Sequence, residues 1–94
     1  MVSRKLIVKS STGMHMEPAE LVAKTAESCD SKIEIRYKNH IINAKSMLNL
    51  LSPGIPYGAE IELRCTGKNE MSDMERMLEV IRSLHDEADS EQVS

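Results

Sequence analysis

The stretch GMHMEPAELVAKTA, residues 13–26, decides where the chain changes from a loop to a helix. Pro18 suits the first helical turn, because its fixed φ is already helical and its missing N–H has no intrahelical partner there. The apolar residues that follow lie at i, i+3, i+4 and i+7, one face of a helix: Ala19, Val22, Ala23 and Ala26. Their small side chains predict that this helix lies close to a sheet.

His15 is expected at or just outside the N-terminus of this helix, where free N–H groups and the helix dipole favour an anion. A neutral imidazole nitrogen is a good nucleophile toward phosphorus and a good leaving group. The position therefore suits a residue that carries a phosphoryl group. Glu17 opposes this interpretation, because it places a carboxylate where a phosphate would favour a cation. The alternative is a histidine that only caps the helix or lies on the surface.

Alternation of apolar and polar residues, which is typical of half-buried strands, occurs in three segments: residues 4–9, 33–37 and 61–65. Lys38-Asn39 suggests a tight turn, since Asn39 tolerates a positive φ better than most residues. Residues 40–43 would then return antiparallel to residues 33–37.

The last helix has the clearest periodicity, with one apolar stripe made of Met71, Met74, Met77, Leu78, Ile81 and Leu84. Asn69 is its candidate N-cap. Asp73 and Arg76 are expected to form an i, i+3 ion pair on its solvent side.

A short helix is predicted over Met47–Leu51, with Ser46 as its natural N-cap. This helix cannot bury all its apolar residues, because Leu48 and Leu51 are spaced i, i+3 while Leu50 points elsewhere. Exposed Met and Leu side chains are typical of docking surfaces. The alternative is that all of them belong to the core.

Composition limits the function classes. The chain has 94 residues, of which 40% are hydrophobic, enough for one domain over residues 1–85 with an acidic, fraying tail over residues 86–94. A net charge of −3 argues against nucleic acid as a partner. No apolar run is long enough for membrane insertion and no signal peptide is visible, so we predict a cytoplasmic protein. Cys29 and Cys65 lack metal spacing and are interpreted as reduced structural thiols, with no metal or cofactor expected.

The element order is therefore β-α-β-β-α-β-α, which predicts an α+β fold. A four-stranded antiparallel sheet with three helices on one face would bury every apolar stripe. The pattern alone leaves the order of the strands open.

Three segments in register resemble the histidine-containing phosphocarrier protein (HPr) family of the bacterial phosphotransferase system. Residues 43–48 resemble its regulatory serine segment, and residues 52–60 resemble the loop before its last strand. Glu17 stands where the family has an arginine. The family's active-site motif is matched at residues 13–19 by Gly13, His15, Pro18 and Ala19. The chain is thus identified as a divergent member of this family.

The resemblance implies an open-faced β-sandwich with strand order 1-4-2-3. It also implies that His15 accepts a phosphoryl group from phosphoenolpyruvate through a charging enzyme and donates it to a sugar-transport component. Such a protein is a transfer intermediate rather than a complete enzyme. The backbone N–H groups of Met16 and Glu17 are expected to hold the phosphate, and the Glu17 carboxylate is expected to slow the transfer.

A second interpretation stays open, in which the chain is a regulatory paralogue with weak or lost carrier activity. It would act through phosphorylation of Ser46 by a serine kinase and through binding to a transcriptional regulator or another enzyme. A third is a divergent paralogue that binds an unrelated partner. A monomer is the expected state.

The resemblance places the partner-docking surface on the short helix, at Met47, Leu48 and Leu51. Met14 and Met16 are expected either to widen this surface or to change the set of partners that it binds. The other two histidines, His40 and His85, are interpreted as exposed residues without a role in the transfer.

Overall fold

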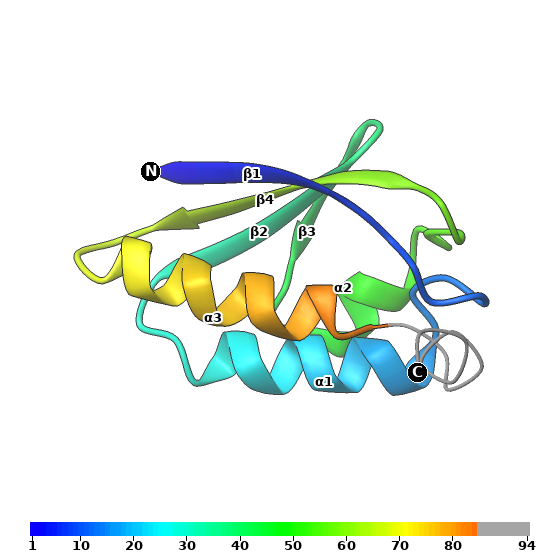
Figure 1. The fold of residues 1–94 in the computed structure, drawn as a ribbon, viewed down its shortest axis with the longest axis horizontal. Coiled ribbons are helices and arrows are strands. Elements are labelled where there is room, and N and C mark those ends of the chain that lie inside the picture. The colour runs from blue at the N-terminus through cyan, green and yellow to red at the C-terminus, as the bar shows by residue number, and fades with distance from the viewer. Residues whose placement is uncertain (85–94) are drawn as a thin grey trace, which may run out of the picture.

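The fold of residues 1–84, which the computed structural model describes, has two layers: an antiparallel sheet and a layer of helices on one of its faces (Figure 1). This arrangement confirms the predicted α+β class and element order. The elements are β1 (Val2–Ile7), α1 (Met16–Glu27), β2 (Lys32–Tyr37), β3 (His40–Asn43), α2 (Met47–Leu51), β4 (Glu60–Thr66) and α3 (Glu70–Arg82). The expected tail over residues 86–94 lies outside the described residues.

The four strands lie in the order β1-β4-β2-β3, which confirms the order 1-4-2-3. All neighbouring strands are antiparallel. The register pairs apolar residues across the strands, for example Leu6 with Ile61 and Ile35 with Leu63. Because paired residues project to the same face, these side chains form one apolar surface under the helices.

Helices α1 and α3 run antiparallel on this surface, so the end of one lies beside the start of the other (Figure 1). Polar contacts fix the arrangement at the end of α1. Asn69 Nδ2 donates to Asp30 Oδ2 at 2.8 Å, and Asp73 Oδ2 accepts from the backbone N–H of Ser31 at 2.9 Å. The last turn of α3, at Arg82, therefore lies at the same end of the domain as the first turn of α1.

The structure corrects two predictions about α3. The predicted ion pair between Asp73 and Arg76 is present, at 3.9 Å, but it is not on the solvent side. Asp73 is only 4% exposed, whereas Met71 is 62% exposed. The inward face of the helix includes Asp73, Met74, Met77 and Ile81, which places Met71 to one side of it. Periodicity favoured the methionine because it is apolar. Asp73 lies on the inward face instead, because Ser31 gives its carboxylate a buried hydrogen-bond partner. Asn69 is the N-cap residue, but its side chain makes no capping hydrogen bond.

The β2–β3 turn also differs from the expectation. The positive φ, of 52°, belongs to Lys38 and not to Asn39. No other non-glycine residue among residues 1–84 has a positive φ. Its ammonium group lies 5.4 Å from the centroid of the Tyr37 ring. This cation–π contact offsets part of the backbone cost.

None of the helices within residues 1–84 has the length and apolar character needed to cross a membrane.

Candidate functional site

His15 is the N-cap residue of α1, where it was predicted to be. Its backbone is extended, with φ of −93° and ψ of −171°, and its carbonyl accepts from the N–H of Ala19 at 3.0 Å. Its side chain makes no capping hydrogen bond and is exposed. The imidazole is therefore held at the start of a helix without being bound to it, which leaves its ring nitrogens accessible.

The loop before His15 is fixed from below by the segment that precedes β4. The N–H of Met14 donates to the carbonyl of Ile55 at 2.8 Å. Gly13 has φ of +75°, and a Cβ at this position would lie 2.2 Å from the same carbonyl oxygen. Only glycine permits both the backbone conformation and this close approach. The sequence indicates a motif over residues 52–60, but only the structure shows that this segment supports the loop carrying His15.

Two backbone donors at the start of α1 have no acceptor within residues 1–84. The N–H of Ala19 is bound to His15, and Pro18 has no N–H. Since the first N–H groups of a helix have no intrahelical acceptor, those of Met16 and Glu17 are left to bind an anion. The geometry is thus compatible with the predicted phosphate-cradling residues, whose role stays a prediction.

Glu17 is exposed in the first turn of α1. Among residues 1–84, no ion pair joins its carboxylate to His15 or to a cation. A carboxylate in the first turn interacts favourably with the helix dipole, which gives Glu17 a structural role. The same charge would repel a phosphate held at this helix end.

Ser46 caps α2 as predicted. Its Oγ accepts from the backbone N–H of Asn49 at 3.3 Å and from Asn49 Nδ2 at 3.1 Å. The neighbouring Lys45 is tied to the end of α1, because its Nζ donates to the carbonyl of Cys29 at 3.1 Å. Ser46 is half-buried, so its hydroxyl is only partly accessible.

The expected docking surface on α2 is partly exposed. Leu48 is 79% exposed, whereas Met47 and Leu51 are half-buried and pack against the core. Leu50 is fully buried, and the exposure of Leu48 confirms that this helix cannot bury all its apolar residues. Met16 is also exposed, but Met14 is buried, so the expectation that Met14 widens the surface is wrong. Its backbone bond to Ile55 turns that side chain into the core.

The cysteines are structural, as predicted. Cys29 and Cys65 are free and buried. Burial raises the pKa of both thiols, to about 11 for Cys65, which disfavours the reactive thiolate. Within residues 1–84, no group of three potential His, Cys, Asp or Glu ligands could hold a metal ion.

His40 is exposed and stacks on Tyr37, and His85 lies outside the described residues.

Comparison with known proteins identifies the family of this chain. The family model described as the PTS HPr component phosphorylation site matches residues 2–83, and it places the domain among the phosphocarriers of the phosphotransferase system. The chain belongs to the HPr family. Members of this family transfer phosphoryl groups and interact with the other enzymes of that system.

The fold is similar to several solved structures. HPr-C-His from Thermoanaerobacter tengcongensis is 30% identical with a TM-score of 0.84, over 89% of this chain and 94% of that one. The histidine-containing phosphocarrier protein of Mycoplasma is 25% identical with a TM-score of 0.81, over 84% and 90%. The catabolite repression protein Crh of Bacillus subtilis is 27% identical with a TM-score of 0.70, over 90% and 98%, and its crystal structure is a domain-swapped dimer. The monomeric state and the cytoplasmic location of this chain stay predictions.

Proposed function

We propose that this chain is a phosphocarrier of the phosphoenolpyruvate-dependent sugar phosphotransferase system and carries the phosphoryl group on His15. The observation that supports this function best is the placement of an exposed imidazole, free of any capping bond, at the N-terminus of α1. Two backbone N–H groups, of Met16 and Glu17, remain there for the phosphate oxygens.

The transfer needs no resident metal or cofactor. A ring nitrogen of neutral His15 attacks the phosphorus of the phosphorylated charging enzyme, so that an N–P bond forms while the bond from phosphorus to the enzyme breaks. The N–P bond then breaks in turn when the acceptor of the sugar-transport component attacks. In both steps this chain supplies position and electrostatic stabilisation. Leu48, Met47 and Leu51 would dock the two partners.

A second candidate function is favoured by Glu17. Its carboxylate would repel a phosphate on His15. Ser46 lies at the start of α2, whose first turn has no acidic residue, so a phosphate there meets no such repulsion. In this function a serine kinase phosphorylates Ser46, and the modified protein binds a transcriptional regulator or another enzyme. Phosphorylation would replace the hydroxyl that accepts from Asn49 with a phosphate.

The experiment is to incubate the protein with phosphoenolpyruvate and the charging enzyme of the same organism, and to follow intact mass and phosphorus NMR. We expect acid-labile phosphate on the wild type and on His40→Ala, a matched change of an exposed histidine, but none on His15→Ala. Labile phosphate on His15→Ala would contradict the proposal. No transfer to the wild type, with acid-stable phosphate on Ser46 from ATP and the kinase, would favour the regulatory function.

A further inference from the structure

The strand β3 lies at one edge of the sheet, beside α2 (Figure 1). Within residues 1–84, only β2 pairs with it, so its outer edge has no neighbouring strand there. Natural proteins usually protect such an edge with charged residues or proline. The other edge strand, β1, contains Arg4 and Lys5, whereas β3 contains no Lys, Arg, Asp, Glu or Pro. The edge of β3 is therefore suited to pairing with a further strand.

The register of β3 shows which backbone groups face this edge. The N–H of Ala44 donates to the carbonyl of Ile33 at 3.0 Å, and bonded pairs alternate with non-bonded pairs along an antiparallel ladder. This alternation turns the N–H and C=O groups of Ile41 and Asn43 away from β2. The bond from the N–H of Ser46 to the carbonyl of Asn43, at 3.0 Å, agrees with this direction. Two donors and one acceptor thus face the edge without a backbone partner within residues 1–84.

Two cavities lie along this edge and form one groove. The first has a volume of ≈ 300 Å³ and the second of ≈ 530 Å³, and both are lined by Ile41 and Asn49. Ile41 is 58% exposed and Leu48 is 79% exposed. The first cavity lies between β3 and the side of α2, where its walls include His40, Ile41, Ile42, Leu48, Asn49 and Pro53. The groove therefore combines unpaired strand backbone with apolar side chains.

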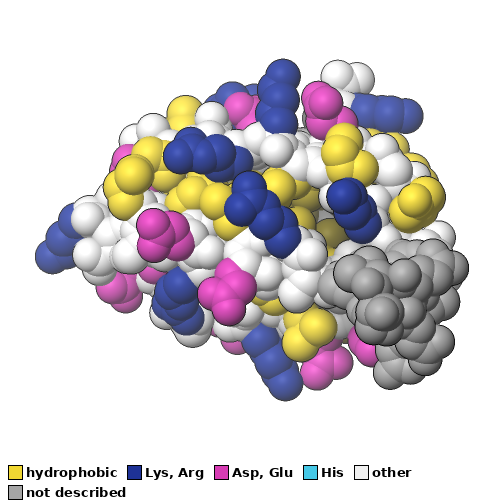
Figure 2. Space-filling model, in the orientation of Figure 1, with side chains coloured by type: hydrophobic (Ala, Val, Ile, Leu, Met, Phe, Trp, Pro, Cys, Tyr) yellow, Lys and Arg dark blue, Asp and Glu magenta, His cyan; other side chains and the backbone are white. Residues whose placement is uncertain are grey.

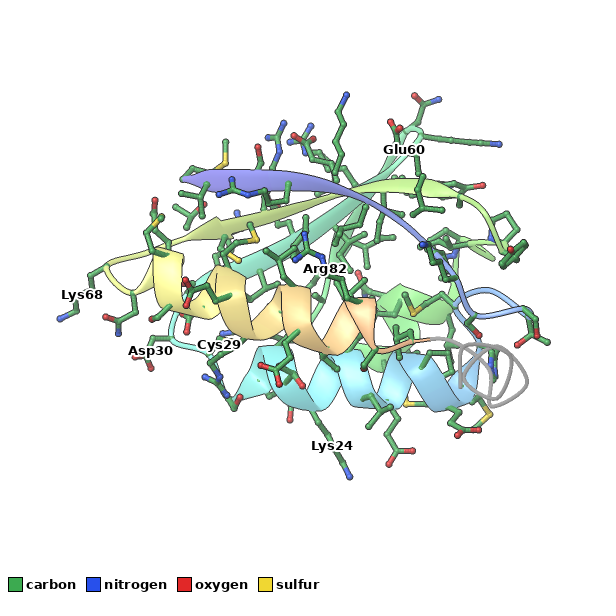
Figure 3. All side chains as sticks on the ribbon, in the orientation of Figure 1. Lys24, Cys29, Asp30, Glu60, Lys68 and Arg82 are labelled. Atoms are coloured by element: carbon green, nitrogen blue, oxygen red, sulfur yellow. The ribbon has the colours of Figure 1, made fainter. Side chains whose placement is uncertain are left out.

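Charge in the groove is balanced. No Lys, Arg, Asp or Glu lines the first cavity. The second cavity has two cations, Lys32 and Lys45, and two carboxylates, Asp30 and Glu34. Lys32 pairs with Glu34 at 3.6 Å. Lys45 donates to the carbonyl of Cys29, next to Asp30, and Figure 3 labels these last two residues side by side. An occupant that complements this groove is uncharged where it lies against α2.

An extended segment of another protein matches these features better than a second copy of this chain does. Each copy has a net charge of −3, so two copies repel each other. Positive and negative side chains are interspersed on the face that Figure 2 shows, which offers no area of one charge to offset this repulsion. A helix could not bond the edge of β3, because its own backbone groups are paired internally. An extended segment offers free backbone groups and alternating side chains.

We propose that the outer edge of β3 binds an extended, uncharged segment of a partner protein, which adds a strand to the sheet. The segment accepts from the N–H groups of Ile41 and Asn43 and donates to the carbonyl of Ile41. Its apolar side chains cover Ile41 and Leu48. The proposal does not depend on phosphoryl transfer to His15, so it is tested separately from the proposed function.

The test is an NMR titration of the full chain with a blocked pentapeptide of alternating threonine and valine. This peptide is uncharged, and its residues favour strands. We expect saturable shifts of the amides of Ile41, Asn43, Leu48 and Asn49. At saturation, exchange of the Ile41 amide with solvent should slow by at least about tenfold, because its hydrogen is then bonded. The same peptide with every backbone nitrogen methylated cannot donate to the edge and should not bind.

Two variants separate the edge of β3 from exposed apolar residues in general. Ile41→Lys places a charge in the middle of β3 and should weaken binding of the peptide by at least about tenfold. Ile7→Lys makes the same change in β1, at a residue that is 46% exposed, and should leave the binding unchanged. A dispersed NMR spectrum of each variant checks that it is folded.

Four results would overturn the proposal. The first is the absence of saturable shifts, and the second is shifts confined to β1. The third is equal binding by the methylated peptide or by Ile41→Lys. The fourth is shifts of the β3 amides that grow with protein concentration in the absence of peptide, which would show that a second copy occupies the edge.

Discussion

The two ends of α1 are held in different ways. At its C-terminal end, side chains of other elements clamp the segment after the helix: Arg76 donates to the carbonyl of Ser28 at 3.2 Å, Lys45 to that of Cys29 at 3.1 Å, and Asp73 accepts from Ser31. At its N-terminal end, a backbone bond supports the loop, from the N–H of Met14 to the carbonyl of Ile55 at 2.8 Å. Polar side chains fix one end, whereas close backbone packing fixes the other.

The C-terminal end of α1 therefore contributes to the stability of the fold, whereas the N-terminal end is open to a ligand. Supporting the N-terminal end by backbone bonds leaves His15 and the first helical N–H groups without side-chain partners in the part of the chain that the structure describes. The clamped end uses its polar groups within the fold, so they are not free for a ligand. The following variants test this comparison, in order of decreasing effect on free energy.

Gly13→Ala should have the largest effect. The added Cβ would lie 2.2 Å from the carbonyl oxygen of Ile55, at a residue whose φ is +75°. We expect the free energy of unfolding, measured in urea, to fall by about 2–4 kcal/mol. Gly54→Ala is the matched control, since its φ is +66° but nothing lies within 4 Å of the added atom, and it should cost about 1 kcal/mol. Equal losses in the two variants would show that the close approach to Ile55 is unimportant.

Asp73→Asn tests the clamped end. The carboxylate accepts from the Oγ and N–H of Ser31 at 2.6 and 2.9 Å in a buried position, so its neutralisation should cost about 1–3 kcal/mol of unfolding free energy. Asp30→Asn, at an exposed residue of the same segment, is the control and should cost less. Phosphate acceptance by His15 should be unchanged. A loss of acceptance in folded Asp73→Asn would mean that the two ends of α1 are coupled.

Asp73 also makes the free energy of unfolding depend on pH. The hydrogen bonds from Ser31 lower the pKa of Asp73 and outweigh the opposite effect of its burial. Because the pKa is lower in the folded than in the unfolded chain, where it is about 3.9, the stabilisation is present above that value and is lost as pH falls through the folded pKa. Urea titrations below about pH 4 should show a steeper loss of stability in the wild type than in Asp73→Asn. Parallel curves would contradict this assignment.

Glu17→Arg tests the electrostatics of the open end. Reversing this charge should speed transfer to His15 by about tenfold, equivalent to about 1.4 kcal/mol, and Glu17→Ala should have a smaller effect. The measurement is the rate of phosphate transfer from the charging enzyme. Glu27→Arg makes the same change at an exposed position of the other end of α1 and should leave the rate unchanged. An unchanged or lower rate for Glu17→Arg would indicate that the partner surface is matched to the glutamate.

His15→Ala should have the smallest effect on stability. The imidazole is exposed and makes no capping hydrogen bond, so the free energy of unfolding should change by less than about 0.5 kcal/mol. Urea denaturation measures this, while acid-labile phosphate should disappear. A large loss of stability would show that the side chain supports the loop after all.

Most of the fold was predictable because hydrophobic periodicity reports local structure. The strands β2 and β4, the cap at Ser46 and the position of His15 all follow from spacing within short segments. The exceptions are residues whose environment comes from distant segments. Asp73 lies 42 positions from Ser31, and Met14 is turned inward by Ile55, so neither burial has a local signal.

The sequence by itself determined the seven elements and their order, the helix N-terminus at His15 and the reversed charge at Glu17. The HPr motifs along the chain also indicated the strand order. Only the tertiary structure decided which polar group is buried, which methionine is exposed, and that the loop of His15 rests on the carbonyl of Ile55. The physical reason is that propensity and periodicity act over a few residues, whereas burial and hydrogen-bond partners depend on segments that meet only in the folded chain.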